Sequence, residues 1–120
     1  MTTVSRVELG CAGHFLCAAD CHWRRHTQVG NYRISSIGDL YFNYEPKRRQ
    51  TVGGGKSDFF ETFVFKTMDD DADSNEGCGC RKVADWSEIE GIRASTAGEA
   101  QACHEKMVKK YLAMARKDLK

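Results

Sequence analysis

The segment that most constrains the fold is residues 59–68, FFETFVFKTM. Phe59, Phe63 and Phe65 share one face of an extended chain. Phe60 and Val64 share the other face. Because side chains alternate between the two faces of a β-strand, a strand with apolar residues on both faces is covered on both sides. The segment therefore predicts a central strand of a sheet, and the rest of the chain must supply its neighbours and its cover.

Further segments carry the pattern expected for strands at the edges or in the middle of such a sheet. They are residues 4–9, 32–37, 40–44 and 86–94. Residues 29–31, Val-Gly-Asn, predict a turn before the second of these segments, and Gly38 with Asp39 predicts a break before the third. The last segment also fits a helical spacing, but its glycine and β-branched residues favour a strand. Short strands joined by such turns predict an antiparallel meander.

Residues 96–117 predict a long amphipathic helix. Thr96 and Glu99 form a capping box, in which the two side chains satisfy amide donors at the start of the helix. Apolar residues then recur at steps of three and four, and lysine and arginine occupy the remainder. The predicted apolar stripe is Ala100, Cys103, Met107, Tyr111 and Met114. A second, much shorter helix of one or two turns is expected from Asp20, as its cap, through Arg25.

Together these elements predict an α+β fold, an antiparallel sheet of four or five strands packed on one face by the C-terminal helix. One domain is expected over residues 1–120, with a β-rich part at 1–95 and the helix at 96–117. The first ten residues, MTTVSRVELG, lack the basic and apolar stretches of a secretory signal, and the chain has no apolar run long enough to span a membrane. We therefore expect a cytoplasmic protein, and free thiols in place of disulfides.

The formal net charge is only +1, but the charges are sorted along the chain. A basic segment at 21–56 precedes an acidic run at 69–76. Charge segregation of this kind suits docking against a partner of complementary charge. The residues expected to contact the partner are Arg24, Arg25, Arg33, Lys47, Arg48, Arg49, Asp69, Asp70 and Asp71.

The segment 13–38 gathers two cysteines and three histidines, which raises a metal hypothesis. Zinc takes four thiolate or imidazole ligands in a tetrahedral arrangement. The candidate ligands are His14, Cys17, Cys21, His22 and His26. Their order, H-x2-C-x3-C-H-x3-H, matches no standard finger or ribbon spacing. We therefore expect no cofactor, with the cysteines as small buried side chains and the histidines in a basic patch, and keep zinc as the alternative.

A catalytic cysteine is a further hypothesis. Cys17 or Cys21 would be the nucleophile and His14 or His104 the base, with neighbouring arginines lowering the pKa of the thiol. No nucleophile motif and no carboxylate pair at a recognisable spacing accompanies these residues. We therefore expect a binding protein and not an enzyme.

Nucleic-acid contact is the remaining hypothesis, because aromatic residues are interleaved with the cations of the basic segment. The aromatic residues are Trp23, Tyr32, Tyr41 and Tyr44. Tyrosines in alternating strands mostly face the core, and a net charge of +1 is small for a dedicated nucleic-acid binder. We expect protein docking first, a zinc-stabilised nucleic-acid-binding module as the alternative and a cysteine-dependent enzyme third.

Four sequence blocks resemble small uncharacterised proteins encoded by bacteriophages and prophages. The blocks are G-H-F at 13–15, C-x-W-R-R-H-T-x-V-G-x-Y-R-I-S-S-I-G-D at 21–39, F-F-E-T-F-V-F at 59–65 and E-A-x-x-x-H-E-x-M-V-x-K-Y at 99–111. The chain departs from this pattern at Ser36, where threonine is expected, and at Cys103, where glycine is expected. The resemblance implies a context, the cytoplasm of an infected bacterial host, and no mechanism.

With the small size and the segregated charge, the resemblance leads us to expect a non-enzymatic, phage-encoded protein that binds a host macromolecule. The expected target is a host protein or ribonucleoprotein complex, such as a defence nuclease complex. Inhibition of that complex would be an anti-CRISPR-like role.

Overall fold

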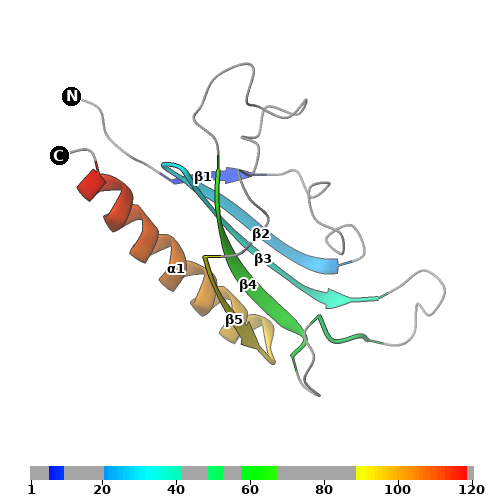
Figure 1. The fold of residues 1–120 in the computed structure, drawn as a ribbon. Helices are drawn as coiled ribbons and strands as arrows, with labels where there is room; N and C mark the ends of the chain where they lie inside the picture. The colour runs from blue at the N-terminus through cyan, green and yellow to red at the C-terminus, as the bar shows by residue number, and fades with distance from the viewer. Residues whose placement is uncertain (1–5, 10–20, 42–48, 53–57, 68–88, 119–120) are drawn as a thin grey trace.

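The computed structural model describes residues 6–9, 21–41, 49–52, 58–67 and 89–118. The elements are β1 (Arg6–Leu9), β2 (Cys21–Val29), β3 (Tyr32–Leu40), β4 (Phe60–Lys66), β5 (Glu90–Ala94) and α1 (Ala97–Asp118). The strands form one sheet in the order β1-β2-β3-β4-β5, and each neighbouring pair is antiparallel. α1 runs along one face of this sheet (Figure 1). The predicted α+β fold class is confirmed.

The β2–β3 hairpin is the longest pairing in the sheet, with nine residues in each strand. Val29 pairs with Tyr32 across the two-residue connection Gly30-Asn31. Gly30 has a φ of 55°, which is a left-handed conformation that glycine adopts without steric cost. Two-residue hairpin turns require such a residue, so the turn predicted at 29–31 is confirmed.

The helical turns predicted up to Arg25 are wrong, because residues 21–25 belong to β2. Cys21 pairs with Leu40 and Trp23 pairs with Gly38 on the neighbouring strand. A helix of one or two turns has too few internal hydrogen bonds to be stable alone. Pairing with a long neighbouring strand supplies those bonds, and the segment is therefore extended.

The break predicted at Gly38 and Asp39 is also wrong, since β3 continues through both residues to Leu40. Asp39 has a φ of 57°, a conformation uncommon for a residue other than glycine, but the pairing with β2 resumes after it. The ring of Phe60 lies against Gly38 and occupies the space that a Cβ atom on this residue would fill. The glycine is therefore needed for close packing and not for a turn. Of the strand predicted at 40–44, residues 42–44 lie outside the described residues.

The hydrophobic core lies between α1 and one face of the sheet. The main cluster is Val29, Ile34, Val64, Met107, Val108 and Tyr111. A smaller cluster near the start of α1 is Phe60, Ala94 and Ala100. Full burial of one large apolar side chain contributes roughly 1.5–3 kcal/mol, so these contacts are the main source of helix docking. The strand predicted at 59–68 is confirmed as β4, with β3 and β5 on either side.

α1 begins where the capping box predicts. The Glu99 amide donates to Thr96 Oγ1 at 3.1 Å. The buried stripe of the helix differs from the predicted one: it is Ala100, His104, Met107, Val108, Tyr111 and Ala115. Met114 is 40% exposed and Cys103 is only partly buried. His104 therefore takes the core position that Cys103 was expected to fill. Among the described residues, no helix has the length and apolar character needed to cross a membrane.

Two glycines allow a matched test of this packing. Gly38→Ala is expected to lower the free energy of unfolding by about 1–3 kcal/mol, because its methyl group would meet the Phe60 ring. Gly98→Ala in α1 is expected to raise it by up to about 1 kcal/mol, because a Cβ atom there meets nothing within 4 Å and alanine is the better helix former. Urea denaturation measures both values. Equal effects of the two substitutions would contradict the packing at Gly38.

Candidate binding site

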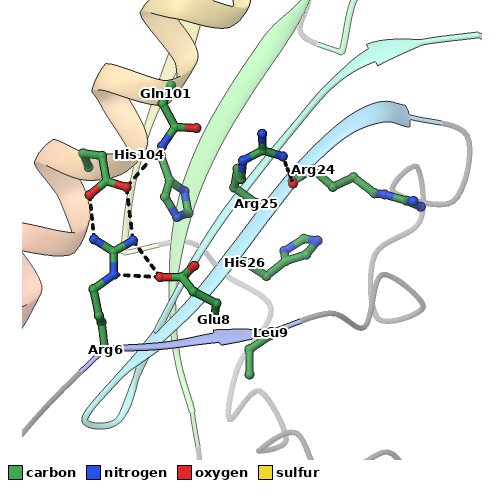
Figure 2. A pocket seen from close by; sticks show the side chains of 9 residues that line it. Arg6, Glu8, Leu9, Arg24, Arg25, His26, Gln101 and His104 are labelled. Atoms are coloured by element: carbon green, nitrogen blue, oxygen red, sulfur yellow. Dashed lines mark hydrogen bonds and ion pairs between the residues drawn. The ribbon is translucent and has the colours of Figure 1, made fainter.

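A cavity of about 470 Å³ lies at the corner where β1, β2 and the first half of α1 meet. Its lining residues are Arg6, Glu8, Leu9, Arg24, Arg25, His26, Gln101, His104 and Glu105. β1 ends at Leu9, opposite His26. Arg24 and Arg25 therefore lie on β2 beyond the end of β1, and Figure 2 shows their side chains diverging from the strand. We call this region the corner cavity.

His104 is the most buried of the residues that line the corner cavity, with 1% of its surface exposed. It follows Ala100 by four residues and precedes Val108 by four, so the helical period directs it at the sheet. Its Nδ1 lies 2.7 Å from Ser36 Oγ on β3. Its Nε2 lies 2.8 Å from Thr27 Oγ1 on β2. The imidazole thus joins α1 to two strands.

The hydrogen bonds around His104 have only one consistent direction when the ring is neutral. Thr27 Oγ1 donates its proton to Glu8 Oε2 at 2.7 Å, because a carboxylate only accepts. Thr27 must then accept from the Nε2–H of His104, which leaves Nδ1 to accept from Ser36. Ser36 in turn accepts from Thr62 Oγ1, 2.6 Å away on β4. The chain therefore runs from Thr62 through Ser36, His104 and Thr27 to Glu8, and we call it the hydroxyl–imidazole chain.

The electrostatic surroundings of His104 agree with a neutral ring. Burial lowers its pKa to about 4, and the nearby carboxylates of Glu105 and Glu8 offset only part of this effect. At neutral pH both ring nitrogens are occupied by hydroxyl partners and the ring carries no charge. His104 therefore positions the helix on the sheet and is not placed to exchange a proton with a ligand.

Arg6 connects β1 to α1 beside this chain. Its Nη1 and Nη2 donate to the two carboxylate oxygens of Glu105 at 2.6 and 3.1 Å, and its Nε donates to Glu8 at 2.7 Å. Gln101 also donates to Glu105, as the dashed lines in Figure 2 show. These contacts raise the pKa of Arg6 and lower the pKa of Glu105. The guanidinium is thus engaged by two carboxylates of the protein itself.

Arg24 and Arg25 present the exposed cations of the corner cavity. As neighbours on a strand they point to opposite faces, with Arg25 on the side covered by α1. The Arg25 guanidinium donates to the Arg24 carbonyl at 2.7 Å and lies 5.0 Å from the centre of the Trp23 ring. An arginine oriented over an aromatic ring keeps donors for a carboxylate or a phosphate. Each of the two arginines can therefore bind an anionic group on its own side of β2.

Of the other residues predicted to contact a partner, those that the structure describes do not line the corner cavity. Arg33 on β3 is 2% exposed, so it does not share an exposed surface with Arg24 and Arg25. Arg49 is exposed, forms an ion pair with Asp39 at 3.0 Å and lies 4.2 Å from the centre of the Phe59 ring. The remaining predicted residues lie outside the described part of the chain: Lys47, Arg48, Asp69, Asp70 and Asp71.

The candidate metal ligands are not brought together where the structure describes them. Cys21 lies on the opposite face of β2 from His22 and His26, because the strand alternates. His22 and His26 are four residues apart on an extended chain, about 13 Å at 3.3 Å per residue, which is too far to share one ion. His14 and Cys17 lie outside the described residues, and no group of three or more His, Cys, Asp or Glu side chains suited to a metal ion occurs within them.

The pairing of Cys21 with His104 as nucleophile and base is not formed. Cys21 is 2% exposed, and both nitrogens of His104 bond to the hydroxyls of Ser36 and Thr27. Ser36, the hydroxyl next to the imidazole, has none of its surface exposed. A substrate therefore reaches neither group in this arrangement.

Sequence reasoning missed the partners of His104 and the ion pairs beside it. The missed residues are Arg6, Glu8, Thr27, Ser36, Thr62, Gln101 and Glu105. One signal was available: the three hydroxyl residues stand two positions from Val29, Ile34 and Val64, so they share the core face of their strands. Three polar residues on core faces, opposite a histidine in the apolar stripe of a helix, predict a buried hydrogen-bond network.

No protein-family model matches the chain, and neither a curated protein nor a solved structure is significantly similar to it. We therefore infer function from the geometry of the corner cavity and from the distribution of charge.

The neutral state of His104 predicts a specific pH dependence. In the unfolded chain the imidazole takes up a proton near its ordinary pKa of 6.5, but in the folded protein only near 4. Between these values the unfolded state binds more protons, so stability falls as the pH is lowered from 6.5 to 4. The expected loss from this group is about 3 kcal/mol, measured by urea denaturation at a series of pH values.

His104→Gln supplies the control, because glutamine keeps a polar side chain but does not titrate. The variant is expected to be less stable by about 2 kcal/mol at pH 7, since it leaves a buried hydroxyl without its partner. All other titratable groups are present in both proteins, so the difference between their pH curves isolates His104. Parallel curves between pH 4 and 6.5 would show that the buried imidazole is not neutral as inferred.

Proposed function

We propose that the protein acts by binding, and that the corner cavity with Arg24 and Arg25 contacts acidic side chains of a partner protein. The observation that carries this proposal is the arginine pair at the cavity, with one guanidinium held against Trp23 and both side chains exposed. His104 is buried and the Arg6 guanidinium is engaged by two carboxylates of the protein, whereas the side chains of Arg24 and Arg25 are exposed. The arginine pair is thus the part of this region best suited to an external anion.

The cavity favours a protein partner over a nucleic acid. Glu8 and Glu105 line it together with the arginines, and their carboxylates repel a run of phosphates. A protein surface that carries both signs of charge can complement such a mixture, which gives specificity and a fast association rate. The concave shape also suits a protruding side chain or loop of the partner.

The resemblance to phage and prophage proteins supports a host macromolecule as the partner, in the cytoplasm of an infected bacterium. Inhibition of a defence nuclease complex, an anti-CRISPR-like role, fits a small protein that acts by docking. The acidic residues Asp69, Asp70 and Asp71 remain part of this proposal as a second contact of opposite charge.

The proposal is tested by removing the arginine pair. Arg24→Gln/Arg25→Gln is expected to weaken the complex with a host protein at least tenfold, because the acidic side chains of the partner lose both guanidinium donors. The partner is first captured from nuclease-treated bacterial lysate, identified and purified, and its affinity is then measured by calorimetry. Circular dichroism checks that the fold is kept, as expected for two exposed side chains.

Lys66→Gln/Arg93→Gln is the matched control, since it removes the same charge from exposed positions on β4 and β5. This variant is expected to bind the partner as the unmodified protein does. Loss of affinity to the same extent in both variants would mean that net charge, and not the corner cavity, drives association. Full affinity in the arginine variant would overturn the proposed site.

A further inference from the structure

α1 carries a second basic surface, apart from the corner cavity. Its members are Lys106, Lys109, Lys110, Arg116 and Lys117, all of them exposed. At 100° per residue these five positions fall within an arc of about 120°. The buried residues Met107, Val108 and Tyr111 point toward the sheet, so the arc faces outward. It extends about 16 Å along the axis, and we call it the basic stripe.

Interactions within the protein explain only part of the basic stripe. The helix dipole favours cations in the last turn, which accounts for Arg116 and Lys117 but not for the lysines in the middle of α1. Lys110 forms an ion pair with Glu90 at 2.6 Å. Among the side chains that the structure describes, Lys106 and Lys109 form no ion pair, and Lys106 is attracted by the Glu90 carboxylate without direct contact.

Repulsion within the basic stripe also lowers the stability of α1. Lys106 stands three and four residues before Lys109 and Lys110, where like charges on a helix destabilise it by a few tenths of a kcal/mol per pair. A cluster of like charge that the fold offsets only in part is suited to an external polyanion, because binding relieves the repulsion and releases counterions.

We infer that the basic stripe binds the phosphate backbone of double-stranded nucleic acid. The cations lie along one edge of the helix, with Lys106 about 6 Å before Lys110 and Lys117 about 10 Å after it at 1.5 Å per residue, and such an edge can follow a row of phosphates. Four of the five are lysines, which act as point charges and carry no bidentate geometry for reading bases. The expected contact is therefore to the backbone and independent of sequence.

The uncharged residues on the outward face of α1 favour a duplex over single strands and membrane surfaces. Ala102 and Ala113 occupy the outward face of α1, and no aromatic side chain lies there. Single-strand binders stack bases on exposed aromatic rings, which the stripe lacks. Helices that lie on membranes insert large apolar residues, and two alanines do not provide them.

This inference goes beyond the proposed function and does not depend on it. The corner cavity lies beside the first half of α1, and the stripe begins at Lys106. The carboxylate of Glu105, engaged by Arg6, lies between the two basic surfaces. Substitutions at one surface therefore leave the other unchanged.

The test measures fluorescence anisotropy of short labelled DNA and RNA duplexes, with the matching single strands, over a range of salt concentrations. We expect the duplexes to bind more tightly than the single strands. The logarithm of the association constant should fall with the logarithm of salt concentration with a slope of about −4, as four or five phosphate contacts require. Comparison of the association constants for the DNA and RNA duplexes shows which duplex is bound more tightly.

Lys106→Gln/Lys109→Gln/Lys117→Gln is expected to weaken duplex binding at least tenfold and to bring the slope to about −1 or −2, since three counterion-releasing contacts are lost. The variant should fold, because it removes exposed like charges. Arg49→Gln/Lys66→Gln/Arg93→Gln removes the same net charge from exposed positions outside both basic surfaces and is expected to keep duplex affinity within twofold.

Three results would overturn the inference. The first is duplex binding that is absent or unchanged in the stripe variant. The second is an equal loss in both triple variants, which would indicate a response to net charge. The third is tighter binding to polyglutamate, or to vesicles of equal parts phosphatidylserine and phosphatidylcholine, than to either duplex. Binding of the partner protein to the corner cavity is measured in a separate experiment. A negative result with nucleic acid therefore does not contradict the proposed function.

Discussion

The neutral imidazole of His104, buried between α1 and the sheet, is the contact on which the rest of the arrangement depends. Apolar side chains drive the helix onto the sheet, but apolar contact is not directional and tolerates small shifts. Hydrogen bonds to Thr27 and Ser36 are satisfied in only one placement of the helix. Any slip would leave buried hydroxyl or imidazole groups unpaired, at about 1–3 kcal/mol for each. The hydroxyl–imidazole chain therefore selects one placement among the many that the apolar core would allow.

The same chain explains how a strand as short as β1 is held. β1 has four residues, and its apolar Val7 is 53% exposed, so burial contributes little to its attachment. Glu8 on β1 accepts the last hydrogen bond of the hydroxyl–imidazole chain, from Thr27. Arg6 on the same strand donates two hydrogen bonds to Glu105 of α1. Exposed ion pairs are weak one by one, but a bidentate pair within a network has more defined geometry. The corner cavity exists because these polar contacts fix the end of β1 beside α1.

The sequence allowed the fold to be predicted where apolar residues follow a clear period. β4 carries apolar residues on both faces, and α1 begins at a capping box, so both were predicted closely. Residues 21–25 were misassigned because their pattern is polar and a local cap signal at Asp20 favoured helix, whereas pairing with β3 decides the conformation. Tertiary pairing overrides weak local preference in this way.

The candidate site could be predicted only in part. Arg24 and Arg25 were identified from local charge, which is visible in the sequence. The partners of His104 were not, because Thr27, Ser36 and Thr62 come from three strands and meet only when the register of the sheet is known. A one-residue slip in that register would turn each hydroxyl to the opposite face. The hydrogen-bond network thus depends on the pairing of strands that are distant in the sequence, and residue types alone do not predict it.

The distribution of carboxylates explains why a net charge of +1 says little about binding. Glu8 and Glu105 engage Arg6, and Glu90 engages Lys110, so these acids offset cations within the fold. The exposed charge that remains on β2 and on the outer side of α1 is mainly basic, and it is divided between the corner cavity and the basic stripe. Two basic surfaces on one protein suit a target that presents acidic protein side chains next to a nucleic-acid duplex. If both contacts form on one ribonucleoprotein complex, the second is intramolecular, and two weak contacts give high affinity through effective concentration.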